Sequence, residues 1–220
     1  MAGASRGLIA AKTLVHLLCL APAAWLGWRI WLEFTGAGGG LGADPVAAIE
    51  HELGLWALRL LLATLAITPL RHWTGQTALL RFRRMLGLYA FAYATLHLAA
   101  YVVLDLRGYW AQLFEDIAKR PYITVGMLAW LLLVPLALTS TKAAIRALGR
   151  NWARLHTLVY AIAVLAVLHF WWLVKSDIRE PLLYAGILAV LLGWRAWHAW
   201  QRRRSATAGR SSPRAPARVD

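Results

Sequence analysis

Cysteine and acidic residues are scarce in this chain, and each scarcity excludes a class of protein. The single cysteine, Cys19, rules out an internal disulfide and any metal site built from cysteines alone. Only ten residues are acidic, against 24 lysines and arginines. Of these acids only Asp105 lies near the end of a long apolar run, and no internal repeat is evident. Both observations argue against a transporter.

Long apolar runs, in contrast, are abundant. The chain is 60% hydrophobic and has a mean hydropathy of +0.53, which is far more apolar than an ordinary soluble domain. Six runs are long enough to cross a membrane: residues 13–32, 53–70, 85–106, 122–138, 151–175 and 182–200. The first could be a signal peptide, but its apolar character continues past Ala21-Pro22-Ala23, which favours an uncleaved helix.

The runs predict an all-α fold, a polytopic membrane bundle of six transmembrane helices. Residues 13–200 would form this single transmembrane domain, with residues 1–12 as a short N-terminal segment and 201–220 as a disordered basic tail. Residues 110–117 could form a short interfacial helix between the third and fourth spans.

The basic residues predict the orientation. If both termini are cytoplasmic, seventeen lysines and arginines lie inside, five lie in outer loops, and Arg29 and Arg59 lie within spans. The positive-inside rule therefore selects two cytoplasmic ends. Because the cations gather at the ends of apolar runs, the net charge of +14 indicates topology and contact with membrane lipid, and not nucleic-acid binding. A cluster at Arg81, Arg83 and Arg84 could alternatively bind the phosphate of a flavin or nucleotide.

Histidines inside the spans are the candidate ligands. His97 lies roughly 18 Å into the third span and His169 roughly 25 Å into the fifth, so the two could face each other and bind one b-type haem. His156 lies at the other end of the fifth span and could bind an inner haem, for which His16 is an outside candidate as second ligand. A straight helix would turn His156 roughly 140° from His169, so this helix must bend or be rewound if both bind in one seam.

Structural roles compete with these assignments. A lone histidine in a membrane helix often forms only a hydrogen bond to a neighbouring helix. His51, His72 and His198 lie near span ends or in a basic loop, and we expect them not to be ligands. Arg59 needs a carboxylate, a carbonyl or a haem propionate as partner, and the sequence does not decide which.

Several segments resemble one known family in order and spacing: GLGADPVAAIEH, LLLATLAITPLR, RRMLGLYAFAYATLH, KRPYITVGMLAW, ALTST and LGRNWARLHTLVYAIAVLAVLHFWW. Over about residues 10–200 the chain resembles the MsrQ (YedZ) family, the haem-binding membrane subunits of bacterial periplasmic methionine sulfoxide reductase systems. That family lies in the ferric-reductase-like transmembrane group, together with the NADPH oxidases.

The resemblance implies an inner-membrane electron-transfer subunit of an oxidoreductase, distinct from the catalytic subunit. It implies heme b, one group or two, with FMN as a further cofactor. Electrons would come from the quinone pool or a cytoplasmic flavin reductase and pass to a periplasmic molybdopterin subunit resembling MsrP. His97, His156 and His169 match the family's haem-ligand positions. Against the oxidases, the third span has one histidine where they have two, and the soluble FAD and NADPH domain is missing. A membrane anchor or assembly subunit without a redox role is the alternative.

Overall fold

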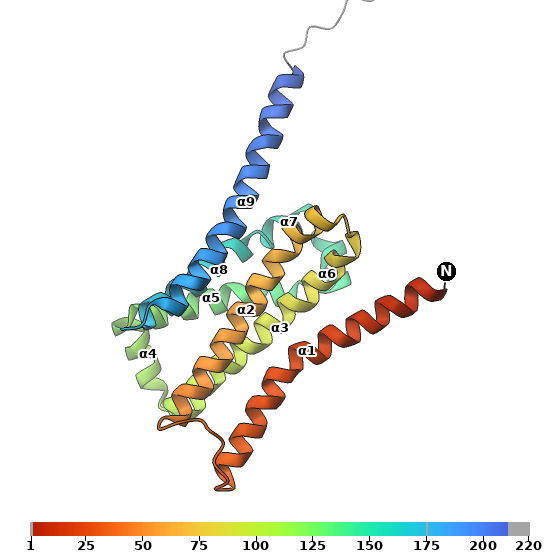
Figure 1. Cartoon of the computed structure of the whole chain (residues 1–220). Coiled ribbons are helices and arrows are strands. Elements are labelled where there is room, and N and C mark those ends of the chain that lie inside the picture. The colour runs from red at the N-terminus through yellow and green to blue at the C-terminus, as the bar shows by residue number, and fades with distance from the viewer. Residues whose placement is uncertain (1, 175, 211–220) are drawn as a thin grey trace, which may run out of the picture.

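The computed structural model describes residues 2–174 and 176–210, and every regular element in these ranges is helical. Figure 1 shows the arrangement. The elements are α1 (Ala2–Phe34), α2 (Pro45–Thr74), η1 (Thr77–Leu79), α3 (Leu80–Ala100), η2 (Tyr101–Asp105), α4 (Trp110–Lys119), α5 (Pro121–Leu138), α6 (Lys142–Leu148), α7 (Arg150–Leu155), α8 (Leu158–Leu173) and α9 (Arg179–Arg210). The all-α prediction is confirmed.

Six helical segments are long and apolar enough to cross a membrane, as the sequence predicts. They comprise residues 6–34, 45–74, 77–105, 121–138, 150–173 and 179–205. Most are longer than expected. The second begins at Pro45 instead of Leu53, because the Asp44 carboxylate accepts a hydrogen bond from the Ala47 N–H (3.0 Å) and Pro45 suits the first helical position.

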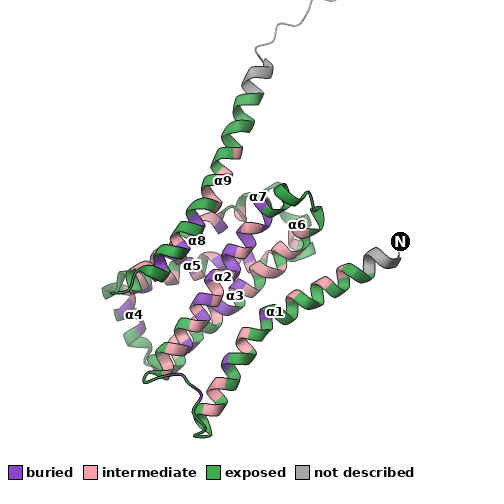
Figure 2. Ribbon diagram, viewed as in Figure 1, coloured by how far each residue is buried: buried purple, intermediate pink, exposed green. Residues whose placement is uncertain are grey.

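Helix α2 is the centre of the bundle and packs against α1, α3, α8 and α9. Just over half of its spanning part is buried (56%), whereas only 6% of the spanning part of α1 is buried. Figure 2 shows this contrast in colour. Helix α2 ends at Gly75, whose φ of 70° is the left-handed conformation that favours glycine, and the chain then turns back into α3.

Two pairs of helices enclose the core of the bundle. Helices α2 and α3 form one pair, and α5 and α8 form the other. Leu65, Ile162 and Ala163 are completely or almost completely buried between them. The facing sides of α5 and α8 carry no lysine, arginine or acid into this interface, and apart from His169 their contacts are mainly aliphatic and aromatic.

The end helices differ most from the sequence-based boundaries. The N-terminal half of α1 leans away from the bundle, and α9 projects beyond it (Figure 1). Helix α1 begins at Ala2, within the predicted N-terminal segment. Helix α9 continues to Arg210, so helical structure enters the tail predicted to be disordered from Gln201, and residues 211–220 lie outside the described ranges.

Helix α4 confirms the expected short helix between the third and fourth spans. It is amphipathic: Leu113 and Asp116 are buried, whereas Trp110 and Phe114 are 61% and 71% exposed. Aromatic side chains of this kind are enriched at membrane–water interfaces, so α4 marks one membrane face of the bundle.

Candidate haem site

The two helix pairs enclose a cavity of about 550 Å³. Its deeper walls are apolar and come from all four helices, through Leu58, Leu61, Ala90, Leu133 and Ile162. Polar residues gather at the end near α4, which we call the cavity mouth: Glu50, His51, Tyr101, Asp105, Arg120 and Tyr122. An apolar cavity with a few convergent polar groups is the usual form of a cofactor site.

His97 enters the cavity from α3 and is fixed by the partner helix of its pair. Its Nδ1–H donates to the Glu50 carbonyl on α2 (2.8 Å). One helical turn further along α2, the ring lies against Gly54, where an added Cβ would approach it to 3.3 Å. The hydrogen bond places the proton on Nδ1, which leaves the Nε2 lone pair available to a metal.

His169 has the same surroundings on the opposite wall. Its Nδ1–H donates to the Tyr122 carbonyl on α5 (2.6 Å), and its ring lies against Gly126 one turn further along. A Cβ at Gly126 would come within 2.6 Å of Nδ1, closer than any real Cβ contact. Each histidine ring thus packs on a glycine of the neighbouring helix. That glycine comes four residues after the residue whose carbonyl accepts the hydrogen bond from the ring.

The two rings face each other across the cavity. Their centres are 6.1 Å apart and their planes make an angle of 76°. A metal–imidazole nitrogen bond is about 2 Å long, so two rings on opposite sides of one metal have centres roughly 6 Å apart. The residues therefore fit a bis-histidine haem, which needs two imidazoles, an apolar slot and a polar edge.

His156 does not line this cavity. It lies where the fifth span is interrupted, between the end of α7 at Leu155 and the start of α8 at Leu158, so the helix is locally rewound there. Its ring stacks on Trp152 (4.0 Å between centres), and its Nδ1–H donates to the Trp152 carbonyl (3.1 Å). Its Nε2 is buried and has no hydrogen-bond partner among the described residues.

The remaining histidines lie apart from His156. His16 on α1 forms a hydrogen bond with the Tyr89 hydroxyl (2.8 Å), and within the described ranges no histidine ring contacts that of His156. His72, near the end of α2, packs against His198 within α9, with ring centres 4.9 Å apart. His51 does line the cavity mouth, where its Nε2 lies 3.4 Å from a Glu180 oxygen.

The two arginines within spans have protein partners. Arg59 donates to the Tyr184 hydroxyl (2.8 Å) and lies over the Trp56 ring. Its partner is therefore a tyrosine, which is none of the three groups considered from the sequence, and Arg59 does not line the cavity. Arg29 donates to the carbonyls of Gly39 and Gly40, which ties the glycine-rich loop between α1 and α2, residues 35–44, to the end of α1.

Sequence reasoning missed three residues at this site, two glycines and one arginine. Gly54 and Gly126 could have been recognised from the sequence, since a glycine inside an apolar helix often permits the close approach of a neighbouring helix. Arg120 gave no sequence signal of a role at the cavity, because it appeared as one of several loop cations. In the structure it lines the cavity mouth, and hydrogen bonding to Tyr122 together with the nearby Asp116 carboxylate raises its pKa, so it stays cationic.

Comparisons with known proteins agree with the geometry. The family described as ferric reductase like transmembrane component matches residues 53–167. The chain is 68% identical, over 97% of both chains, to the "Protein-methionine-sulfoxide reductase heme-binding subunit MsrQ" of Xanthomonas euvesicatoria pv. vesicatoria (strain 85-10). It is 51% identical to the protein of the same name from Caulobacter vibrioides (strain ATCC 19089 / CIP 103742 / CB 15), over 91% of this chain and 90% of that one. No solved structure matches it. The chain therefore belongs to the MsrQ family within the ferric-reductase-like transmembrane group, as a multi-pass protein of the bacterial inner membrane.

Proposed function

We propose that this chain binds b-type haem between His97 and His169 and carries electrons across the inner membrane for a methionine sulfoxide reductase. One observation carries the proposal: the two imidazoles face each other across an apolar cavity at a spacing suited to a single metal between them. The relatives' names, each a haem-binding subunit of such a reductase, support it.

The chain's residues account for the chemistry of such a site. The Glu50 and Tyr122 carbonyls fix the proton on each Nδ1, so each Nε2 presents its lone pair to the cavity. The aliphatic walls exclude water. A haem with two imidazole ligands supplies one-electron transfer and leaves no open coordination position for a substrate.

We further propose the direction of transfer. With both termini cytoplasmic, the α4 end of the bundle and the cavity mouth face the periplasm, where a molybdopterin-containing, MsrP-like subunit would accept electrons. Donors on the cytoplasmic side would be the quinone pool or a flavin reductase. FMN remains a proposal from the family resemblance, with Arg81, Arg83 and Arg84 as candidates for its phosphate.

The proposal extends to a second haem, bound by His156. Its support is the buried Nε2, which makes no hydrogen bond of ordinary geometry among the described residues although the Leu136 backbone lies near the ring; a buried polar atom in this position requires an explanation. The second axial ligand is open, because His16 is already hydrogen bonded to Tyr89. The measured ratio of haem to protein decides between one haem and two, and loss of one haem in a His156→Ala variant would assign this ligand.

Absorption spectroscopy tests the main proposal. Protein expressed with sufficient haem should show a Soret band and, on reduction, a sharp α band. The variants His97→Ala and His169→Ala should each lose at least tenfold in haem affinity, since outer partners alone contribute ten- to a hundredfold at metal sites and these are the proposed ligands themselves. His72→Ala, at the opposite end of α2, is the matched control and should bind as the wild type. Wild-type protein without haem bands would instead support an anchor or assembly role.

A further inference from the structure

The cavity mouth contains one permanent cation beside several acids. Among the described residues that line the cavity, Arg120 is the only lysine or arginine, and Glu50 and Asp105 lie at the same end. The deeper walls are aliphatic. The cavity is thus amphipathic, with one end suited to a charged group and the rest suited to an apolar body.

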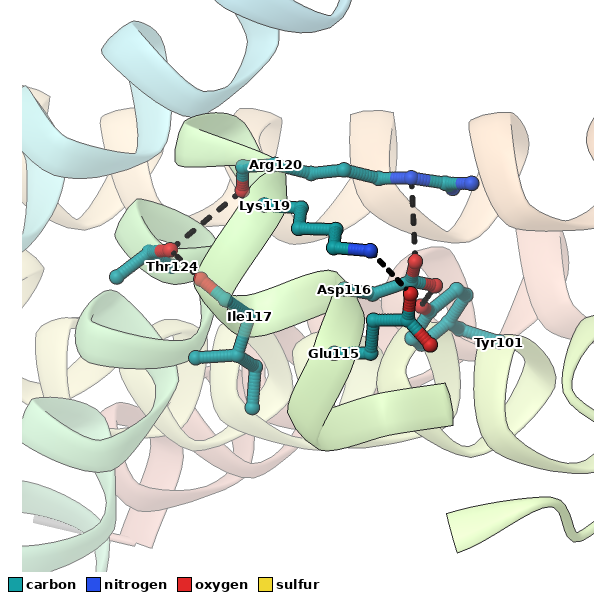
Figure 3. A network of polar contacts seen from close by, with 7 residues as sticks. All are labelled: Tyr101, Glu115, Asp116, Ile117, Lys119, Arg120 and Thr124. Carbon is teal, nitrogen blue, oxygen red and sulfur yellow. Dashed lines mark hydrogen bonds and ion pairs between the residues drawn. The ribbon is translucent and has the colours of Figure 1, made fainter. Parts of the chain in front are cut away.

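A buried carboxylate holds Arg120 in place. Asp116 is only 5% exposed and lies on the inner side of α4. Its Oδ1 is 3.2 Å from the Arg120 Nε, and its Oδ2 accepts a hydrogen bond from the Tyr101 hydroxyl (2.6 Å). Figure 3 shows the three side chains together, with Arg120 extended across the carboxylate. A carboxylate removed from water needs such partners, so the network fixes the guanidinium relative to the cavity.

The guanidinium retains donors for a further anion. Arginine has five N–H donors in a planar fork, and Asp116 faces the single donor on Nε. Tyr122 is its other hydrogen-bond partner, and the side chain is still 46% exposed, so the protein does not enclose the whole fork. A second carboxylate can therefore be bound by the same side chain, and paired N–H donors favour carboxylates over neutral groups.

The other charges at the mouth restrict where an anion can lie. The Asp105 carboxylate would repel a second carboxylate, and Glu50 has no donor to offer it when ionised, so an anion is favoured only beside Arg120. Arg59, the other cation considered for such a role, is bonded to Tyr184 and does not line the cavity. A ligand with an apolar body and a carboxylate at its edge matches this distribution, and a b-type porphyrin has that form.

We infer that Arg120, positioned by Asp116 and Tyr101, binds a porphyrin carboxylate at the cavity mouth and so fixes how haem is oriented between His97 and His169. This inference rests on the proposed function, because it assumes that haem occupies the cavity. It adds a binding residue outside the ligand histidines and assigns a role to α4, which supplies the carboxylate that holds it.

Esterified porphyrin provides the direct test. Haem and its dimethyl ester, which lacks the carboxylates, are each titrated into haem-free full-length protein in detergent. The wild type should bind haem about tenfold more tightly than the ester, since a hydrogen bond to a charged group contributes at least this much. Arg120→Gln should abolish that preference, and Arg120→Lys should keep part of it, because a point charge replaces the fork.

Arg179→Gln is the matched control. Arg179 lies at the start of α9, its side chain is 93% exposed, and it does not line the cavity, so the variant loses the same charge on the surface. It should keep the full preference for haem. In Arg120→Gln the midpoint potential of bound haem should become more negative, because loss of a nearby cation favours the oxidised, more positive iron; Arg179→Gln should leave the potential unchanged.

The outcomes separate this inference from the function on which it rests. If wild-type protein binds haem and the ester equally, the role of Arg120 is wrong although haem binding stands, and this result requires no variant to fold. An unaltered preference in Arg120→Gln would likewise show that Arg120 does not bind the carboxylate. If the wild type binds neither porphyrin, the proposed function fails and the inference fails with it.

Discussion

At the scale of single residues, the positions of the proposed ligands His97 and His169 depend on glycines of the neighbouring helices. A Cβ at Gly126 would lie 2.6 Å from the His169 Nδ1, so the Gly126→Ala variant must displace the imidazole or separate α5 from α8. We expect at least a tenfold loss of haem affinity, because an axial ligand would leave its bonding position. Gly54→Ala should have a smaller effect, since its Cβ would lie 3.3 Å from the His97 ring. Titration with haem measures both.

Two other glycines provide matched controls for this prediction. Gly186 and Gly193 lie within α9, and a Cβ at either position would meet nothing within 4 Å. Gly186→Ala and Gly193→Ala should therefore bind haem as the wild type does, while sharing any general gain in helix propensity. Equal haem affinity in Gly126→Ala and Gly186→Ala would show that the close approach is unimportant for the site.

Sequence patterns anticipated the histidines better than the residues around them. His97 and His169 could be paired from depth alone, because helix rise converts sequence position into distance across a membrane. Their carbonyl acceptors and glycines could not be found in this way, since the acceptors lie 47 positions away and the glycines 43, and each contact depends on which helix faces which. Arg120 was hidden for another reason: its ion pair with Asp116 is local, four residues apart, and only the packing of the helices places it beside the cavity.

At the scale of elements, one tyrosine ties α1 to the rest of the bundle. The Tyr93 hydroxyl donates to the Cys19 carbonyl (2.7 Å) and accepts from the Ala23 N–H (3.0 Å), two groups that would bond to each other in a regular helix. It therefore occupies a break in α1 beside Pro22, where the helix has already lost a donor.

Tyr93→Phe should release this attachment. Without the hydroxyl, the Cys19 carbonyl and Ala23 N–H can bond directly, which straightens α1 and leaves the His16–Tyr89 hydrogen bond as its remaining polar contact with α3 among the described residues. We expect a loss of about 1 kcal/mol in stability and faster reaction of Cys19, now only 4% exposed, with a membrane-permeable maleimide. Tyr109→Phe, on a side chain that is 70% exposed, should leave the Cys19 labelling rate unchanged. Unchanged labelling in Tyr93→Phe would contradict this account of the break.

Element boundaries were predicted less well than element number. Six apolar runs gave six spans, because only a helix satisfies its own backbone in lipid. Hydropathy alone placed the start of the second span at Leu53, although the Asp44-Pro45 pair is a helix-start signal. The break at His156 follows from no local residue preference, since neither glycine nor proline lies between Leu155 and Leu158.

At the scale of the whole molecule, the cavity makes α2–α3 and α5–α8 a single functional unit. Each pair supplies one histidine, one carbonyl acceptor and one glycine, so neither pair alone can bind a metal on both sides. Within the described part of the chain, helices α1 and α9 supply no lining residue and pack around this unit. The proposed transfer of electrons across the membrane then depends on which end of the unit faces the periplasm.

Orientation is the last prediction, and it follows from charge. Most lysines and arginines lie at the α6 end of the bundle and beyond, which the positive-inside rule places in the cytoplasm. In a Cys19→Ala background, Ala111→Cys on α4 and Ala147→Cys on α6 place exposed thiols at opposite ends of the bundle. An impermeant maleimide added to intact spheroplasts should label the α4 thiol, and it should reach the α6 thiol only after lysis. The reverse pattern would place the cavity mouth in the cytoplasm, where it could not deliver electrons to a periplasmic reductase.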